Sequence, residues 1–130
     1  EYNENVGEIT DIINSDVMIS DWSGVSMEYA FTTEKPMVFI DTKPKIRNFN
    51  WEKLDLPCIE ENIRENIGKI ISEKKLESLP KVIKKLIMDK NLWTEKIKKV
   101  RDKSVFNIGT SGKVGSEIIY KILNNQNDTK

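Results

Sequence analysis

The sequence predicts an α/β protein, a small parallel sheet with several flanking helices. Two short apolar runs, residues 17–20 and 36–41, are typical of buried strands, and a helical pattern separates them. Strand, helix and strand in this order predict one right-handed βαβ crossover with parallel strands. Helical patterns fill most of the second half of the chain. Half of a doubly wound domain has this organisation, so we expect missing strands upstream of Glu1.

The first half of the chain divides into five predicted elements. Apolar residues at helical spacing over 6–13 predict a helix that ends near Asn14, and the strand 17–20 follows. The next helix begins near Ser23 or Gly24 and is apolar almost all round, which predicts burial. After the strand 36–41 we expect a polar loop over 42–55 and a brief third strand at 57–59.

The second half is predicted to be helical. Asn62 and Glu65 have the spacing of a capping box, and Ile63, Ile67, Ile70 and Ile71 predict one helix face. Ser78 and Pro80 open the next helix, and a separate helix follows Asn91 with Trp93, Ile97 and Val100. Ser111 is expected to cap the last helix. Its predicted buried face comprises Val114, Ile118, Ile119, Ile122 and Leu123, and the polar tail from Asn124 to Lys130 is expected to fray.

Composition excludes several classes of function. The 130 residues suit a single domain, and 21 basic residues balance 21 acidic ones, which argues against nucleic-acid binding. No histidine is present, so the commonest general base and metal ligand is missing, and we expect neither a metal nor another cofactor. The single cysteine, Cys58, is expected to be a small core residue. No apolar run is long enough to span a bilayer, and the chain is expected to be cytoplasmic.

The junction between the first strand and the following helix is the strongest candidate site. Parallel sheets bind ligands at the carboxyl ends of their strands, and helix N-termini attract phosphates through free amides and the helix dipole. Ser23 and the amides of Gly24, Val25 and Ser26 are predicted to coordinate phosphate oxygens, and Glu28 to accept hydrogen bonds from ribose hydroxyls. Asp21 belongs to the same cluster. The simpler alternative is that Ser23 is an N-cap and Glu28 an acid that complements the helix dipole.

Weaker candidates lie elsewhere. Gly109, Gly112 and Gly115 resemble a phosphate loop only superficially, because the Walker spacing is absent, but Ser111 and Lys113 form a secondary candidate anion site. Asp41 is expected at the same sheet edge as Asp21, where it lines the cleft or only caps its strand. Lys45 and Arg47 either reach an anionic substrate or are solvated loop charges. No pair of catalytic carboxylates can be assigned.

The segment Ser20-Asp21-Trp22-Ser23-Gly24, with Glu28 as the following acid and Lys35-Pro36 before the next strand, resembles the C-terminal part of the CDP-glycerol glycerophosphotransferases of teichoic acid synthesis. That family usually has Tyr at the position of Trp22 and a second Ser at the position of Gly24. The resemblance covers about the first half of the chain. The segments 106–109 and 111–115 resemble family C-termini more loosely.

The resemblance implies a GT-B transferase, in which a Rossmann-like C-terminal domain holds the nucleotide donor. Residues 1–130 would then be one domain of a larger protein: a donor-binding βαβ core at 1–60, a helical part at 61–124 and a tail at 125–130. The implied partners are CDP-glycerol or a related activated donor and a missing N-terminal domain. The family's catalytic histidines are absent here, so we expect no transfer by this chain alone and assign no catalytic residue. The parent protein is expected in cell-wall or capsular polymer synthesis, at the cytoplasmic face of the membrane.

Two other functions stay open. The first is the donor lobe of an ordinary glycosyltransferase or a sugar-nucleotide epimerase, which would share an acid on the helix after the strand. The second is a non-catalytic α/β interaction module, in which the same residues would only cap a helix.

Overall fold

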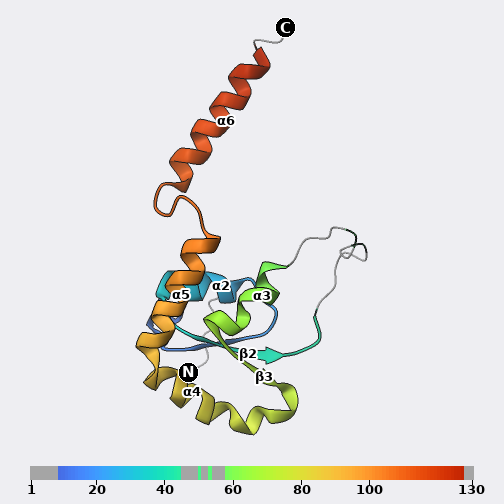
Figure 1. The fold of residues 1–130 in the computed structure, drawn as a ribbon, viewed down its shortest axis with the longest axis vertical. Helices are drawn as coiled ribbons and strands as arrows, with labels where there is room; N and C mark the ends of the chain where they lie inside the picture. Colours follow the sequence, from blue (N-terminus) through green and yellow to red (C-terminus); the bar gives the residue numbers. More distant parts are fainter. Residues whose placement is uncertain (1–8, 45–49, 51–52, 54–57, 128–130) are drawn as a thin grey trace. The chain divides into compact units, whose positions relative to one another are not determined.

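The computed structural model describes residues 9–44, 50, 53 and 58–127, and the structural statements below concern these residues. The elements are α1 (Ile9–Asn14), β1 (Met18–Ser20), α2 (Val25–Thr33), β2 (Met37–Asp41), α3 (Ile59–Ile67), β3 (Gly68–Ser72), the 3-10 helix η2 (Glu73–Ser78), α4 (Leu79–Met88), α5 (Lys90–Ser104) and α6 (Ser111–Asn127) (Figure 1). The protein is α/β, with a small parallel sheet flanked by helices, as the sequence predicts.

The sheet contains three strands in the order β1-β2-β3, and both pairs are parallel. β2 lies in the centre, where Met37 pairs with Met18 on one side and with Gly68 on the other. The predicted β1-α2-β2 crossover is therefore present. Because the strands are parallel, their carboxyl ends meet at one edge of the sheet, at Ser20, Asp41 and Ser72.

The third strand does not lie where the sequence predicted it. Cys58 precedes α3, and Ile59 is already its first helical residue, whereas Pro57 is outside the described residues. The strand instead comes from residues 68–72, for which we predicted a continuing helix. Gly68 ends α3 in an extended conformation (φ −174°), and the short apolar run after it pairs with β2.

The predicted capping box at Asn62 is also wrong, because Asn62 lies inside α3 rather than at its start. Its side-chain amide donates to the carbonyl oxygen of Cys58 at 3.1 Å. Cys58 occupies the N-cap position without a side-chain cap, and it is exposed rather than part of the core. Our prediction from the sequence therefore began this helix about one turn too late.

The chain forms two compact units, residues 1–100 and 101–130, and the boundary falls within α5. The core belongs to the first unit. Its buried apolar side chains come from α2, β2, α3, β3, α4 and α5: Tyr29, Ala30, Met37, Val38, Phe39, Ile63, Ile67, Ile71, Leu86, Trp93 and Ile97. The predicted burial of α2 holds for Tyr29 and Ala30, whereas Val25 at its start is exposed.

The second unit contains the end of α5 and the helix α6. The predicted buried face of α6 is not covered by residues of this unit, since Ile118, Ile119, Ile122 and Leu123 are all more than half exposed. Val114 is partly buried. The helix continues to Asn127, so residues 124–127 are helical rather than frayed, and residues 128–130 are outside the described range. None of the helices described is long and apolar enough to cross a bilayer.

Candidate functional site

The predicted site is a corner formed by the carboxyl end of β1 and the start of α2. Gly24 is the N-cap residue, with φ −58° and ψ −26°, and it is exposed together with Val25. A Cβ added at Gly24 would meet no atom within 4 Å, so a ligand has room to approach this backbone. The amides of Gly24 and Val25 precede the first hydrogen bond of the helix, which leaves them available to an anion.

Ser26 has a different role from the one predicted. It is buried, its hydroxyl donates to the carbonyl oxygen of Ser23 at 2.6 Å, and its amide donates to the same oxygen at 3.1 Å. Both donors of Ser26 therefore close the first turn of α2 instead of facing a ligand. In this conformation the donors left to a phosphate are the amides of Gly24 and Val25 and the hydroxyl of Ser23.

The acids of the corner suit hydroxyl groups rather than phosphate. Glu28 is exposed in the first turn of α2, and Asp21 is partly exposed just after β1. Carboxylates accept hydrogen bonds but repel phosphate oxygens. The role predicted for Glu28, accepting hydrogen bonds from ribose hydroxyls, stays a prediction, and Asp21 is better suited to such a role than to phosphate contact.

A buried arginine, which the sequence analysis missed, adds positive charge to this corner. Arg64 on α3 is 5% exposed, and its Nη1 donates to Asp41 Oδ1 at 3.2 Å. Its guanidinium carbon lies 4.0 Å from the centroid of the Trp22 ring and 5.0 Å from that of Phe39. Asp41, which the sequence placed at this edge, is thus an ion-pair partner at the end of β2.

The environment of Arg64 is incomplete. Its Nε and Nη2 are buried, and in the part of the chain that the structure describes they have no hydrogen-bond partner. The aromatic faces offset part of the lost hydration, since a desolvated cation–π contact contributes about 2 kcal/mol. An unsatisfied buried donor costs about 1–3 kcal/mol, and more when it is charged. The sequence held one signal for this residue: a charged side chain between Ile63 and Ile67, on the helix face that faces the core.

Trp22 connects the two strand ends. Its indole Nε1 donates to the carbonyl oxygen of Thr42 at 2.7 Å, which ties the β1–α2 turn to the end of β2. Trp22 therefore covers Arg64 and fixes the turn that carries Ser23 and Gly24.

The lysine of the Lys35-Pro36 motif is structural. Its ammonium group donates to the carbonyl oxygens of Ile13 at 2.7 Å, in the last turn of α1, and of Ser15 at 2.8 Å, just after α1. The Tyr29 hydroxyl donates to the Ser15 carbonyl as well, at 3.0 Å. Burial raises the pKa of Tyr29, so this hydroxyl stays protonated well into the alkaline range. Together these bonds hold α2 against the turn that precedes β1.

The remaining candidates are not brought to the corner. Lys45 and Arg47 lie outside the described residues. Ser111 and Lys113 are exposed in the first turn of α6, in the second unit, where the amide of Val114 donates to Thr110. The secondary anion site at Ser111 and Lys113 stays a prediction.

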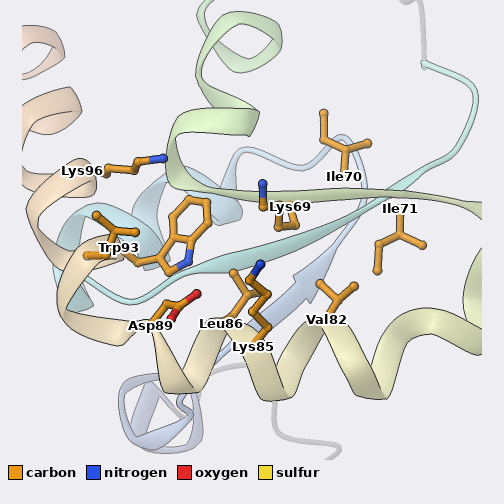
Figure 2. A pocket seen from close by; sticks show the side chains of 10 residues that line it. Lys69, Ile70, Ile71, Val82, Lys85, Leu86, Asp89, Trp93 and Lys96 are labelled. Atoms are coloured by element: carbon orange, nitrogen blue, oxygen red, sulfur yellow. The ribbon is translucent and has the colours of Figure 1, made fainter.

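The cavity of about 290 Å³ lies away from this corner, between β3, α4 and α5. Its wall includes the buried Trp93, and the ammonium groups of Lys69 and Lys96 lie 5.7 Å and 4.9 Å from the centroid of that ring. Figure 2 shows Lys85 extending from α4 toward β3 beside Trp93, with Asp89 below the ring. Because lysines surround it, this cavity is an alternative place for an anion, and experiments on the corner must control for it.

Within the described part of the chain, no group of three or more His, Cys, Asp or Glu side chains is arranged to hold a metal ion. Comparison of the sequence and the structure with protein-family models, curated proteins and solved structures found no match.

Proposed function

We propose that this chain is the donor-binding lobe of a nucleotide-dependent transferase that resembles the CDP-glycerol glycerophosphotransferases. The donor's diphosphate would lie against Ser23 and the amides of Gly24 and Val25, and Glu28 would accept hydrogen bonds from the ribose. A second domain would supply the acceptor site and the groups that transfer protons. The proposed donor is CDP-glycerol, and the proposed location is the cytoplasmic face of the membrane.

One observation carries the proposal: a helix N-terminus with open backbone at the carboxyl end of a parallel strand. In parallel α/β sheets the ligand lies outside these strand ends, at the point where helix amides converge. The amides would stabilise negative charge on the departing nucleotide as the donor bond breaks, which is a large electrostatic contribution in such reactions. Asp21 and Glu28 make a bare phosphate a poorer ligand than a nucleotide with hydroxyl groups.

Titration of ¹⁵N-labelled protein with CDP, CMP, UDP and GDP tests the proposal. We expect CDP to shift the amide resonances of residues 23–28 and to bind more tightly than CMP, because the second phosphate reaches the helix N-terminus. A preference for UDP or GDP would instead support the glycosyltransferase or epimerase alternative. If no nucleotide shifts these resonances, the proposal is rejected in favour of a non-catalytic module.

The variant Glu28→Gln tests the assignment of the ribose acid. It removes a charged acceptor from the ribose hydroxyls, so we expect CDP affinity to fall about tenfold, as for the loss of one charge-assisted hydrogen bond. Glu95→Gln, at an exposed position of α5, is the matched control and should bind CDP as the unsubstituted protein does. Equal affinities of the two variants would remove Glu28 from the site.

A further inference from the structure

Arg64 has more hydrogen-bonding capacity than the fold uses. A guanidinium carries five N–H groups, and the ion pair with Asp41 uses Nη1. Nε and Nη2, which together form one edge of the guanidinium plane, are buried and have no hydrogen-bond partner among the described residues. Buried polar groups in native proteins are nearly always paired, so this free edge points to a missing partner.

The Arg64 guanidinium lies beside the corner already described. Trp22, which covers the guanidinium at 4.0 Å, directly precedes Ser23 and the open amides at Gly24 and Val25. Asp41, which binds the other side of the guanidinium, is the last residue of β2. The guanidinium, paired with Asp41 through Nη1 alone, and the helix N-terminus therefore lie at the ends of two adjacent parallel strands, and the donors of both favour an anion.

We propose that Arg64 is an anion-binding residue of this corner and that its Nε and Nη2 bind one phosphoryl group of the ligand through two parallel hydrogen bonds. This bidentate geometry is the usual one between arginine and phosphate or carboxylate. A phosphoryl group fits better here, because its further oxygens would face the amides of Gly24 and Val25. The inference rests on the proposed function and adds Arg64 as a residue that binds one phosphoryl group of the diphosphate.

Trp22 must move for the ligand to enter. Nε and Nη2 are sealed from solvent in the present conformation, and the Trp22 ring lies over the guanidinium. The ring is only partly buried, and its Nε1 donates a hydrogen bond to the Thr42 carbonyl. Displacing the ring toward the solvent would open the free edge of Arg64, while the half-exposed Asp41 keeps Nη1 in place.

Fluorine NMR of the full chain labelled with 5-fluorotryptophan tests this inference with inorganic pyrophosphate as the probe. The chain has three tryptophans, Trp22, Trp51 and Trp93, and Trp→Phe variants assign their resonances. We expect pyrophosphate to shift the Trp22 resonance saturably. In the ¹⁵N spectrum of the same protein, the Nε–H signal of Arg64 should shift with the same dissociation constant.

Two substitutions test the role of the guanidinium. Arg64→Lys keeps a charge but loses the bidentate edge, and Arg64→Met keeps the apolar length without charge; we expect at least tenfold weaker pyrophosphate binding by both. Circular dichroism confirms that each variant is folded. Should the variants fail to fold, the Arg64 Nε–H signal of the unsubstituted protein still tests whether Arg64 binds pyrophosphate. An unchanged signal at saturating pyrophosphate overturns the inference.

Lys69→Gln and Lys85→Gln are the controls for the cavity beside Trp93, and we expect both to bind pyrophosphate normally. A shift of Trp93 instead of Trp22, or weaker binding by these variants, would place the anion in that cavity and overturn the inference. CDP binding that is unaffected by Arg64→Met would also overturn it while the proposed function stands. If pyrophosphate binds at Arg64 but no nucleotide shifts the amide resonances of residues 23–28, the proposed function is rejected and the anion site at Arg64 is supported.

Discussion

At the scale of single residues, one hydrogen bond raises the pKa of the only cysteine in the sequence. The Cys58 Sγ donates to Glu60 Oε2 at 2.9 Å, and this bond to a carboxylate is the main cause that raises the pKa of Cys58. The same bond lowers the pKa of Glu60. The stabilisation from Glu60 is therefore present above the ordinary pKa range of glutamate and is lost as the pH falls through the lowered pKa.

We predict that Glu60→Gln makes Cys58 more reactive. A neutral amide stabilises the protonated thiol less than a carboxylate does, so the pKa falls and the thiolate fraction near pH 8 rises. Iodoacetamide alkylation, followed by mass spectrometry across pH 7–10, should become several-fold faster at pH 8. Glu61→Gln, one position along the exposed start of α3, is the control, and an equal rate for both variants would refute the role of this bond.

The residues of the corner differ in how far the sequence predicts them. Ser23, Gly24 and Glu28 follow from the strand–helix junction, because the start of a helix is a local property. The inward direction of Ser26 and the stacking of Arg64 under Trp22 depend on contacts between elements. Arg64 lies 42 residues after Trp22, and only the packing of α3 near the end of β2 brings the two together.

At the scale of elements, the close pairing of β2 and β3 depends on a glycine. A Cβ at Gly68 would lie 2.2 Å from the carbonyl oxygen of Met37 and 2.7 Å from its carbonyl carbon. Both are backbone atoms of the neighbouring strand, so they cannot move without disturbing the ladder. The glycine is required here by the close approach of two strands rather than by its φ angle.

We therefore predict that Gly68→Ala destabilises the protein by about 3 kcal/mol, the upper part of the usual range for overpacking a core. Urea unfolding measured by circular dichroism checks this value. Gly24→Ala is the matched control, because the space around Gly24 is open, and it should change the stability by about 0.5 kcal/mol or less. Similar midpoints for the two variants would contradict the observed strand pairing.

The assignment of β3 shows where local patterns are insufficient. Ile63, Ile67, Ile70 and Ile71 have helical spacing, and a short apolar run such as Ile70-Ile71 is equally compatible with a strand. Gly68 is the local sign that the helix ends. The strand forms because the open edge of β2 offers backbone hydrogen bonds to residues 68–72, and the sequence does not state which segment takes that edge.

At the scale of the whole molecule, the buried apolar side chains of the described residues lie in the first unit. Ile97 on α5 is fully buried in the core, whereas Ile119 on α6 is 60% exposed. We predict that Ile97→Ala costs about 2–5 kcal/mol, because it leaves a cavity in the core. Ile119→Ala should cost about 0.5 kcal/mol or less. Thermal unfolding of both variants checks the contrast, and a comparable loss from Ile119→Ala would show that α6 is packed in solution.

The sequence by itself determined the α/β class, the β1-α2-β2 crossover and the strand–helix junction at which a ligand is expected, because local periodicity and turn chemistry encode them. Only the tertiary structure decided which segment forms β3, that Ser26 closes its own helix turn, and that Arg64 adds a buried charge to the corner. These features depend on contacts between residues far apart in the chain. Such contacts depend on how all segments of the chain pack into one core, and a local sequence pattern does not predict that packing.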